Sequence, residues 1–390
     1  MLVHVAIVSE QLLPTVIPCL MAQPDRVVLV ASRAMAGQAR RLRAVLQEHG
    51  IKSEIHGVPV PDFRINAIRA YATKLAEKLE TDHTEAELVF NATGGTKLMT
   101  LGFVDVFQDR ADRIIYTDTA HAQIEVIHDR RTAKPQPEPM RSVLDVPRYL
   151  AVQGFRYQGD CSKDQDLRAR MTARGDAARY LADHALPLAG LIGMLNHLVN
   201  TQALDADGRS LKQPAQSLGN QPRAPWPAAL KTLHQAGVLQ WSGGPEIRFP
   251  DIESARFLSG GWLEEYAFTV AEEANLHDVR LNVHGVWDGA EAARNEFDVL
   301  ACHRNRLLFV ECKTLKFEEG RHDNELSYKV ESLGKDTRGL FGDIWLVTAR
   351  VPTKVLRDRA RQAGFRLIGP TDLPYLRKLV REWKQGASTT

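Results

Sequence analysis

Two carboxylates and a lysine lie close together in the segment from 295 to 314, NEFDVLACHRNRLLFVECKT. Two apolar, β-branched runs flank a short polar turn, and this pattern predicts a β-hairpin. Glu311 and Lys313 are two positions apart, so they lie on the same face of one strand. Asp298 lies on the partner strand, within reach of that face. The spacing therefore predicts that three charged side chains converge on an apolar scaffold.

Such a convergence favours metal chemistry. A carboxylate buried in a sheet is costly unless it is paired or binds a metal ion. Ligands made only of oxygen suit Mg²⁺ or Mn²⁺. A divalent ion would polarise a phosphodiester and help to generate hydroxide from water. Lys313 can orient or deprotonate that water and balance charge in the transition state.

A Glu-x-Lys pair alone is more typical of a solvated strand face. Three features favour a catalytic face instead. Asp298 lies one hairpin strand upstream, and the strand LLFVECKT is otherwise apolar. The preceding helix opens with GGWLEEYAF, which places Glu264 and Glu265 near the sheet beside an apolar stripe.

These residues resemble the PD-(D/E)XK nuclease family, in which a helix with an acidic residue precedes a hairpin bearing Asp and then Glu-x-Lys. The resemblance spans roughly Gly260 to Leu379, and the usual proline before the first Asp is absent. It implies Asp298 and Glu311 as metal ligands, Lys313 as the catalytic lysine, the Cys312 carbonyl as a further ligand, Glu264 rather than Glu265 as the helical acid, and Glu296 as an assisting group.

Two further basic residues can contact phosphates. Lys329 is predicted on the helix that follows the Glu-x-Lys strand, and helices in that position often contribute to such sites. Arg338 precedes Gly339, and an ordinary solvated surface charge is the favoured interpretation for it.

A second constellation is LVFNATGGTKLMTLGF, residues 88–103. A strand is expected to end at Asn91, and a helix to begin near Lys97. The small turn between them then lies where α/β folds bind phosphates. Gly94 and Gly95 allow backbone N–H groups to approach an anion closely. The spacing fits neither GxxxxGK[ST] nor GxGxxG, so it implies neither ATP hydrolysis nor NAD binding. The alternative is a tight turn with a surface lysine.

The turn and its setting resemble the CARF family, the CRISPR-associated Rossmann-fold sensors. The first predicted strand also ends in Ser9-Glu10-Gln11, where CARF domains often place ligand contacts. The resemblance implies a homodimer that binds a cyclic oligoadenylate, cyclic tetra-adenylate being favoured, across its two-fold axis. The implied contacts are Ser9, Glu10, Gln11, Thr93, Gly94, Gly95, Thr96 and Lys97. Sensor and nuclease in one chain resemble the ancillary nucleases of type III CRISPR antiviral defence.

Hydrophobic periodicity divides the chain into four segments. Residues 1–131 alternate strands and helices, which predicts a Rossmann-like α/β domain with a mainly parallel sheet. Residues 132–143, rich in proline and polar side chains, are predicted to be a linker. Residues 144–257 contain helices and then a short hairpin, as a winged helix does. Residues 258–390 predict a mixed α/β, restriction-endonuclease-like domain with a helix at 324–333.

Composition sets outer limits on the function. The chain has 390 residues, with 44% hydrophobic and 25% charged residues and a net charge of +2, so no global basic field indicates nucleic acid. Four cysteines occur without a CxxC pair, which argues against zinc and suits a reducing cytoplasm. No signal peptide or membrane span is expected.

Three functions remain to be weighed. The leading hypothesis is a ligand-gated, metal-dependent endonuclease that acts on DNA, RNA or both. A CARF sensor joined to a winged-helix transcription regulator would not need Asp298, Glu311 and Lys313. An ungated endonuclease of the restriction type would leave the NATGGTK turn without a role. The middle segment can transmit the signal, grip DNA or act as a dimerising spacer, and scattered basic residues favour the spacer.

Overall fold

The computed structural model describes residues 1–205, 207–290, 294–314 and 342–386. The chain divides into two compact units whose boundary falls between Arg156 and Tyr157. The division into a sensor, linker, connector and nuclease domain stays a prediction. Of the described helices, none is long and apolar enough to cross a membrane.

The first unit is built on a seven-stranded sheet in the order β3-β2-β1-β4-β5-β6-β7. The five strands from β3 to β5 run parallel, and β6 and β7 are antiparallel to their neighbours. The strands are Leu2–Ile7 (β1), Arg26–Val30 (β2), Ser53–Ile55 (β3), Glu87–Asn91 (β4), Arg113–Asp118 (β5), Gln123–Asp129 (β6) and Glu138–Pro139 (β7). The apolar runs of β1, β2 and β4 are buried on both faces, as in a doubly covered parallel sheet.

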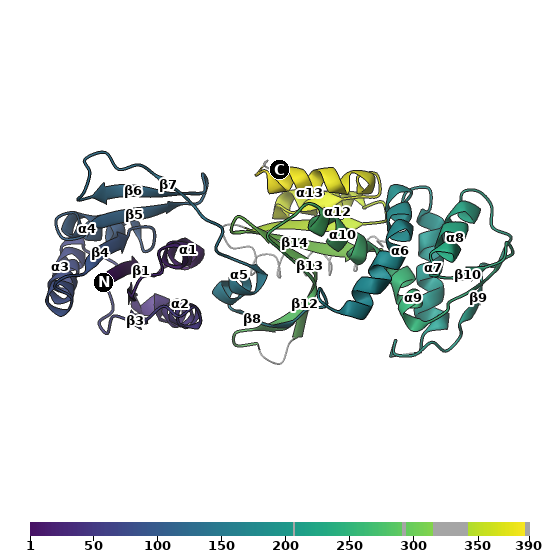
Figure 1. Cartoon of the computed structure of the whole chain (residues 1–390), viewed down its shortest axis with the longest axis horizontal. Helices are drawn as coiled ribbons and strands as arrows, with labels where there is room; N and C mark the ends of the chain where they lie inside the picture. Colours follow the sequence, from purple (N-terminus) through teal and green to yellow (C-terminus); the bar gives the residue numbers. More distant parts are fainter. Residues whose placement is uncertain (206, 291–293, 315–341, 387–390) are drawn as a thin grey trace. The chain divides into compact units, whose positions relative to one another are not determined.

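Helices cover both faces of this sheet (Figure 1). One face packs against α3 and α4, whose Ile68, Ala72 and Phe103 join the core with Val5 and Phe90. The other face is covered by α1 and α2, and α5 packs against both of these helices. The helices are Leu13–Ala22 (α1), Ala36–Glu48 (α2), Ile65–Asp82 (α3), Lys97–Phe107 (α4) and Val146–Gln153 (α5), and a short 3₁₀ turn, η1, covers Arg33–Met35.

The second unit contains a six-stranded mixed sheet in the order β16-β15-β14-β13-β12-β8. Strands β12, β13 and β14 form an antiparallel meander, whereas β14, β15 and β16 run parallel. Their bounds are Phe155–Gly159 (β8), Asp278–Trp287 (β12), Arg294–His303 (β13), Arg306–Lys313 (β14), Gly342–Thr348 (β15) and Arg366–Ile368 (β16). The predicted hairpin is present, and Arg304 and Asn305 both have positive φ, as a two-residue turn requires.

Helices and a small sheet complete this unit. A three-stranded antiparallel sheet has the order β10-β11-β9, and β9 precedes α8 in the chain. Strands β10 and β11 form a hairpin directly after α8, so the predicted hairpin after a helix is confirmed. One continuous core runs from Met171 in α6 to Trp383 in α13. The elements are Gln165–Asp183 (α6), Ala189–Leu198 (α7), Trp226–Gln235 (α8), Ile252–Arg256 (α9), Trp262–Glu273 (α10), Lys354–Ala363 (α12), Leu376–Lys384 (α13), Ala215–Ser217 (β9), Gln240–Trp241 (β10) and Glu246–Arg248 (β11), with π-turns at Val199–Ala203 (η2) and Phe257–Gly261 (η3) and a 3₁₀ turn at Leu373–Tyr375 (η4).

The mixed α/β fold class is confirmed, and most differences are local. Helix α5 and strands β8 and β9 were not expected, because their short segments carry little periodicity. The segment predicted as a linker contributes β7, which pairs with β6. The helix predicted at 324–333, with Lys329, and also Arg338, lie outside the described residues.

Candidate functional site

Asp298, Glu311 and Lys313 converge in the second unit. The Lys313 ammonium lies 2.7 Å from Glu311 Oε1 and 3.9 Å from Asp298 Oδ2. Glu311 is fully buried, because β14 lies between β13 and β15. Lys313, the last residue of β14, is part-exposed. Two acidic groups and one cation therefore meet on neighbouring strands, as the spacing predicts.

The backbone of Cys312 holds the Asp298 carboxylate in place. The Cys312 N–H donates a hydrogen bond of 2.7 Å to Asp298 Oδ2. The Cys312 side chain points away from this contact, and its thiol lies 3.8 Å from the Leu263 carbonyl of α10. The residue between Glu311 and Lys313 thus joins the candidate site through its main chain, where a carbonyl ligand was predicted.

Glu264 and Glu265 are neighbours on α10 with different partners. Glu265 is buried and forms a bidentate ion pair with Arg174 of α6. Glu264 instead lies close enough to Asp298, Glu311 and Lys313 for their charges to act on it. The structure therefore groups Glu264, not Glu265, with the catalytic candidates.

Proton affinities in the group reflect its crowding. Burial and the neighbouring Asp298 carboxylate raise the pKa of Glu264 to about 8. Burial lowers the pKa of Lys313, but the Glu311 and Asp298 carboxylates outweigh this effect and raise it above its ordinary value. Lys313 is thus protonated in the metal-free protein. Glu264 is mostly protonated at neutral pH and loses its proton near pH 8.

The donor set fits a hard divalent cation with an incomplete protein shell. Among the described residues, no three His, Cys, Asp or Glu side chains gather closely enough to hold a metal alone. Mg²⁺, however, commonly takes one or two carboxylates and completes its shell with water and substrate phosphate. Asp298 and Glu311 are such a pair. Burial, and after it the Asp298 charge, raises the pKa of the adjacent Glu264, and a bound cation would favour its ionised form.

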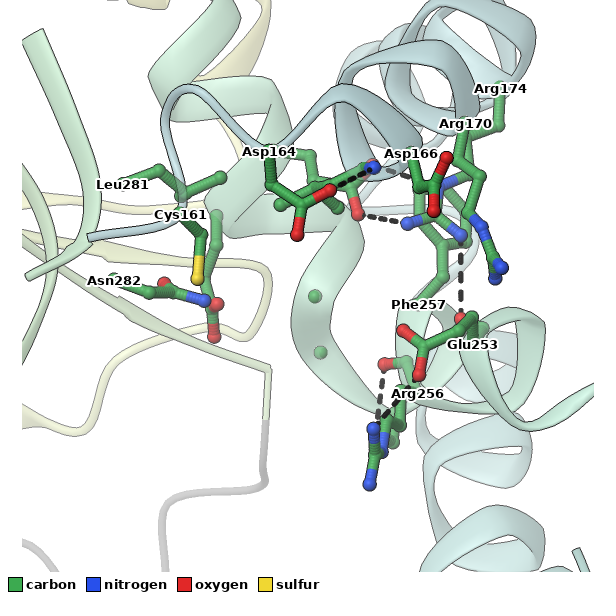
Figure 2. A pocket seen from close by; sticks show the side chains of 16 residues that line it. Cys161, Asp164, Asp166, Arg170, Arg174, Glu253, Arg256, Phe257, Leu281 and Asn282 are labelled. Atoms are coloured by element: carbon green, nitrogen blue, oxygen red, sulfur yellow. Dashed lines mark hydrogen bonds and ion pairs between the residues drawn. The ribbon is translucent and has the colours of Figure 1, made fainter. Parts of the chain in front are cut away.

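A pocket of about 630 Å³ opens beside Glu264. Cys161, Leu281 and Asn282 line one side of it, and α6 with the segment around α9 lines the other (Figure 2). Its arginines are largely engaged, since Arg174 pairs with Glu265 and Arg256 lies 2.9 Å from Glu253. The lining therefore carries no excess of positive charge. A bound cation would supply the positive charge that a phosphodiester needs.

We expect Glu264→Gln to flatten the pH dependence of stability in metal-free protein. The folded chain binds a proton at Glu264 up to about pH 8, whereas the unfolded chain releases it near the ordinary carboxyl pKa of 4.5. The free energy of unfolding of the wild type therefore falls as the pH rises through this window. In EDTA, the melting temperature of Glu264→Gln should exceed that of the wild type by roughly 2–4 °C at pH 8 and match it near pH 5. Parallel curves would contradict this.

The predicted sensor residues lie at one edge of the first sheet. The loops after β1 and β4 are neighbours, because these two strands pair in parallel. Ser9, Glu10, Gln11, Gly95 and Thr96 line a pocket of about 410 Å³ at this edge. Ser32, Met35 and Asp62, from the loops after β2 and β3, also line it. Thr93, Gly94 and Lys97 are not among the lining residues.

A helix cap and two glycines shape the turn after β4. Thr96 is the N-cap of α4, and its hydroxyl accepts a hydrogen bond from the Met99 N–H. A Cβ at Gly94 would lie 1.8 Å from the Ile7 carbonyl oxygen of β1, so only glycine fits there. Gly95 has φ +85°, which also favours glycine. The exposed Lys97 is the first residue of α4.

Buried Asn91 fixes this turn through its amide. Asn91 Oδ1 accepts bonds from the Thr93 N–H at 3.0 Å and the Thr93 hydroxyl at 2.6 Å. The Thr93 hydroxyl in turn accepts a 2.8 Å bond from the Thr117 N–H of β5. Asn91 and Thr117 also both donate to the Pro14 carbonyl of α1. The asparagine of NATGGTK thus connects β4, β5 and α1.

We expect Asn91→Ala to destabilise the first unit by about 1–3 kcal/mol, because it leaves the Thr93 donors without their buried acceptor. Differential scanning calorimetry should show a lower melting temperature. Ser53→Ala is the control, since it also removes a side-chain hydrogen bond in this unit, but from a part-exposed residue. Equal melting temperatures for Asn91→Ala and Ser53→Ala would contradict the role given to Asn91.

Comparisons with known families agree with this two-part geometry. Residues 3–149 match the family model of the Card1 CARF domain. Residues 251–387 match the model of the Card1-like endonuclease domain. The chain is a CARF nuclease, with a Card1-type CARF domain and a Card1-like endonuclease domain. No curated protein matches this CARF nuclease significantly.

Solved structures show the same fold for this CARF nuclease. Protein VC1899 from Vibrio cholerae has a TM-score of 0.84 at 23% identity, covering 100% of this chain and 99% of its own. Can2 from Sulfobacillus thermosulfidooxidans, in complex with cyclic tetra-adenylate, has a TM-score of 0.76 at 22% identity, covering 97% of both chains. A type III CRISPR defence DNA nuclease activated by cyclic oligoadenylate has a TM-score of 0.51 at 18% identity, covering 90% of this chain and 46% of its own.

Some residues of this CARF nuclease belong to one of the two candidate sites although no sequence pattern indicates them. Asn282 has φ +52° and lies on β12 between the partners of Phe297 and Val299, opposite Asp298. Asp62 reaches the sensor pocket from a loop of no recognisable motif. Asn91 was the exception, because it stands within the NATGGTK motif.

Proposed function

We propose that this CARF nuclease is a cyclic tetra-adenylate-activated, metal-dependent endonuclease of type III CRISPR antiviral defence, which works in the cytoplasm on DNA, RNA or both. The observation that carries the proposal is the meeting of Asp298, Glu311 and Lys313 within the endonuclease domain of a chain that also contains a CARF domain. The similar Can2, solved in complex with cyclic tetra-adenylate, supports the activator, and the similar type III CRISPR defence DNA nuclease supports the pathway.

In the proposed reaction, Asp298 and Glu311 would hold a Mg²⁺ or Mn²⁺ ion, with the Cys312 carbonyl as a further donor. Such an ion would supply Lewis acidity toward the scissile phosphate. Lys313 then exchanges its carboxylate contacts for the attacking water and the developing phosphate charge. Glu264 lies beside this group and can carry a proton near neutral pH. Glu296, exposed and two positions from Asp298, can assist.

On the sensor side, we propose that Ser9, Glu10, Gln11, Thr93, Gly94, Gly95, Thr96 and Lys97 contact the activator. The α4 N-terminus and the Lys97 charge suit its phosphates. The acidic Glu10 and Asp62 suit hydrogen-bond donors on its bases. A two-fold symmetric ring binds identical subunits best on their common axis, so the active form is a homodimer.

The decisive experiment incubates the protein with plasmid DNA and with single-stranded RNA, each with Mn²⁺ or Mg²⁺, in the presence and absence of each cyclic oligoadenylate. We expect cleavage of at least one substrate only when metal and cyclic tetra-adenylate are both present. Cleavage that ignores the activator would refute gating. DNA binding without any cleavage would instead favour a transcription regulator.

A further inference from the structure

Helix α10, which carries Glu264, is anchored from its other side by α6. Arg174 of α6 and Glu265 of α10 are both buried, and the guanidinium Nε lies 2.9 Å from Glu265 Oε2 within a bidentate pair. Arg174 also lies over the Phe257 ring, 4.6 Å from its centroid. Because Glu264 and Glu265 are adjacent, fixing Glu265 also fixes where Glu264 can point.

A second anchor comes from α7. Asn196 is buried, and its amide donates to the Thr314 hydroxyl at 3.1 Å and to the Ser259 carbonyl. The Thr314 hydroxyl donates to the same carbonyl at 3.2 Å. Thr314 directly follows Lys313, and Ser259 lies in η3, the turn that leads into α10. One side chain therefore joins the end of β14 to the start of α10.

The backbone of η3 is shaped for this contact. Gly260 has φ +154°, inside the range that side chains rarely adopt, and a Cβ there would lie 3.1 Å from the Thr314 hydroxyl. The turn thus approaches Thr314 as closely as a residue without a side chain permits.

We infer that Arg174 of α6 and Asn196 of α7 are positioning residues that set the distance between Glu264 and the Glu311–Lys313 strand. The inference rests on the proposed function for the identity of the reaction. Arg174 reaches this region through its ion pair with Glu265, and Asn196 reaches it through its hydrogen bond to Thr314. The middle segment is then part of the catalytic apparatus and more than a spacer.

The test uses full-length protein with activator and compares Thr314→Val, Thr314→Ser and Thr348→Val. Thr314→Val keeps the shape but removes the hydroxyl that bridges Asn196 and Ser259. Thr348 is the matched control, because it is a fully buried threonine opposite Lys313 on β15 whose hydroxyl bonds to the Arg350 backbone. The readouts are kcat, KM for nucleic acid, and the affinity for Mn²⁺ measured by calorimetry without substrate.

For Thr314→Val we expect kcat to fall by about 10- to 100-fold at an unchanged KM, and Mn²⁺ affinity to fall about 10-fold. Thr314→Ser should recover both, and Thr348→Val should retain both. Equal losses in Thr314→Val and Thr348→Val, no loss in Thr314→Val, or a wild type without Mn²⁺ affinity would overturn the inference. If the wild type binds Mn²⁺ but cuts no nucleic acid, the proposed function fails while the affinity series still decides the inference.

The ion pair is tested by the double variant Arg174→Met with Glu265→Met. Replacing a buried ion pair by apolar side chains often leaves stability unchanged. We expect a melting temperature near that of the wild type, with kcat and Mn²⁺ affinity reduced as in Thr314→Val. A double variant that melts normally and retains full kcat and Mn²⁺ affinity would overturn the role given to Arg174.

Discussion

Lys313→Ala should lose strand cleavage by about 10²–10⁴-fold while cyclic tetra-adenylate binds as tightly as to the wild type. The ammonium lies 2.7 Å from Glu311 and is the only cation found beside both strand carboxylates in the described part of the site. Glu311→Gln, which keeps the side-chain shape but removes the charge, should show a comparable loss. Single-turnover cleavage with saturating metal and activator measures both effects.

Lys378→Ala is the control for this pair of variants. Lys378 is exposed on α13, where it lies 3.8 Å from Glu382 in a surface ion pair, so its removal should leave cleavage unchanged. Full cleavage by Lys313→Ala, measured beside an active Lys378→Ala, would withdraw Lys313 from the reaction. Lost activator affinity in Lys313→Ala would show that the two units are not independent in binding.

Lys97→Ala should weaken cyclic tetra-adenylate binding by about 10- to 100-fold, because a hydrogen bond to a charged group contributes roughly 1.5–3 kcal/mol. The activator concentration for half-maximal cleavage should rise by a similar factor, with maximal cleavage unchanged. Calorimetric titration gives the affinity, and a cleavage titration gives the half-maximal concentration.

Lys78 provides the comparison for the sensor. It is exposed on α3 of the same unit and lines no part of the pocket at the strand edge, so Lys78→Ala should bind the activator normally. An unchanged affinity in Lys97→Ala would place the phosphates elsewhere. Because Lys97 is not itself a lining residue, this outcome would direct attention to the Gly95 and Thr96 backbone.

Much of this architecture follows from local patterns. The apolar runs of β1, β2 and β4 and the helical stripes of α2 and α3 predicted the Rossmann-like unit, since both periods are written in contiguous residues. The two-residue spacing of Glu311 and Lys313 likewise predicted their common face. The fold class and the meeting of the three charged groups could therefore be reached without coordinates.

Other features could not be predicted, because they depend on contacts between distant segments. The Arg174–Glu265 pair joins residues 91 positions apart, and the Asn196–Thr314 bond joins residues 118 apart. No local period marks an arginine or an asparagine for such a contact. The complete burial of Glu311 is similar, because it depends on β15, a parallel neighbour that a later segment of the chain provides.

The tight packing of Gly94 against the Ile7 carbonyl has a thermodynamic consequence for ligand capture. This close backbone contact holds the turn after β4 against the end of β1, so the neighbouring Ser9 and Gly95 are positioned in the pocket wall before any ligand arrives. A receptor that needs little ordering spends little conformational entropy upon association. Selectivity among cyclic nucleotides of different circumference is then decided by shape fit to a preformed surface rather than by loop folding.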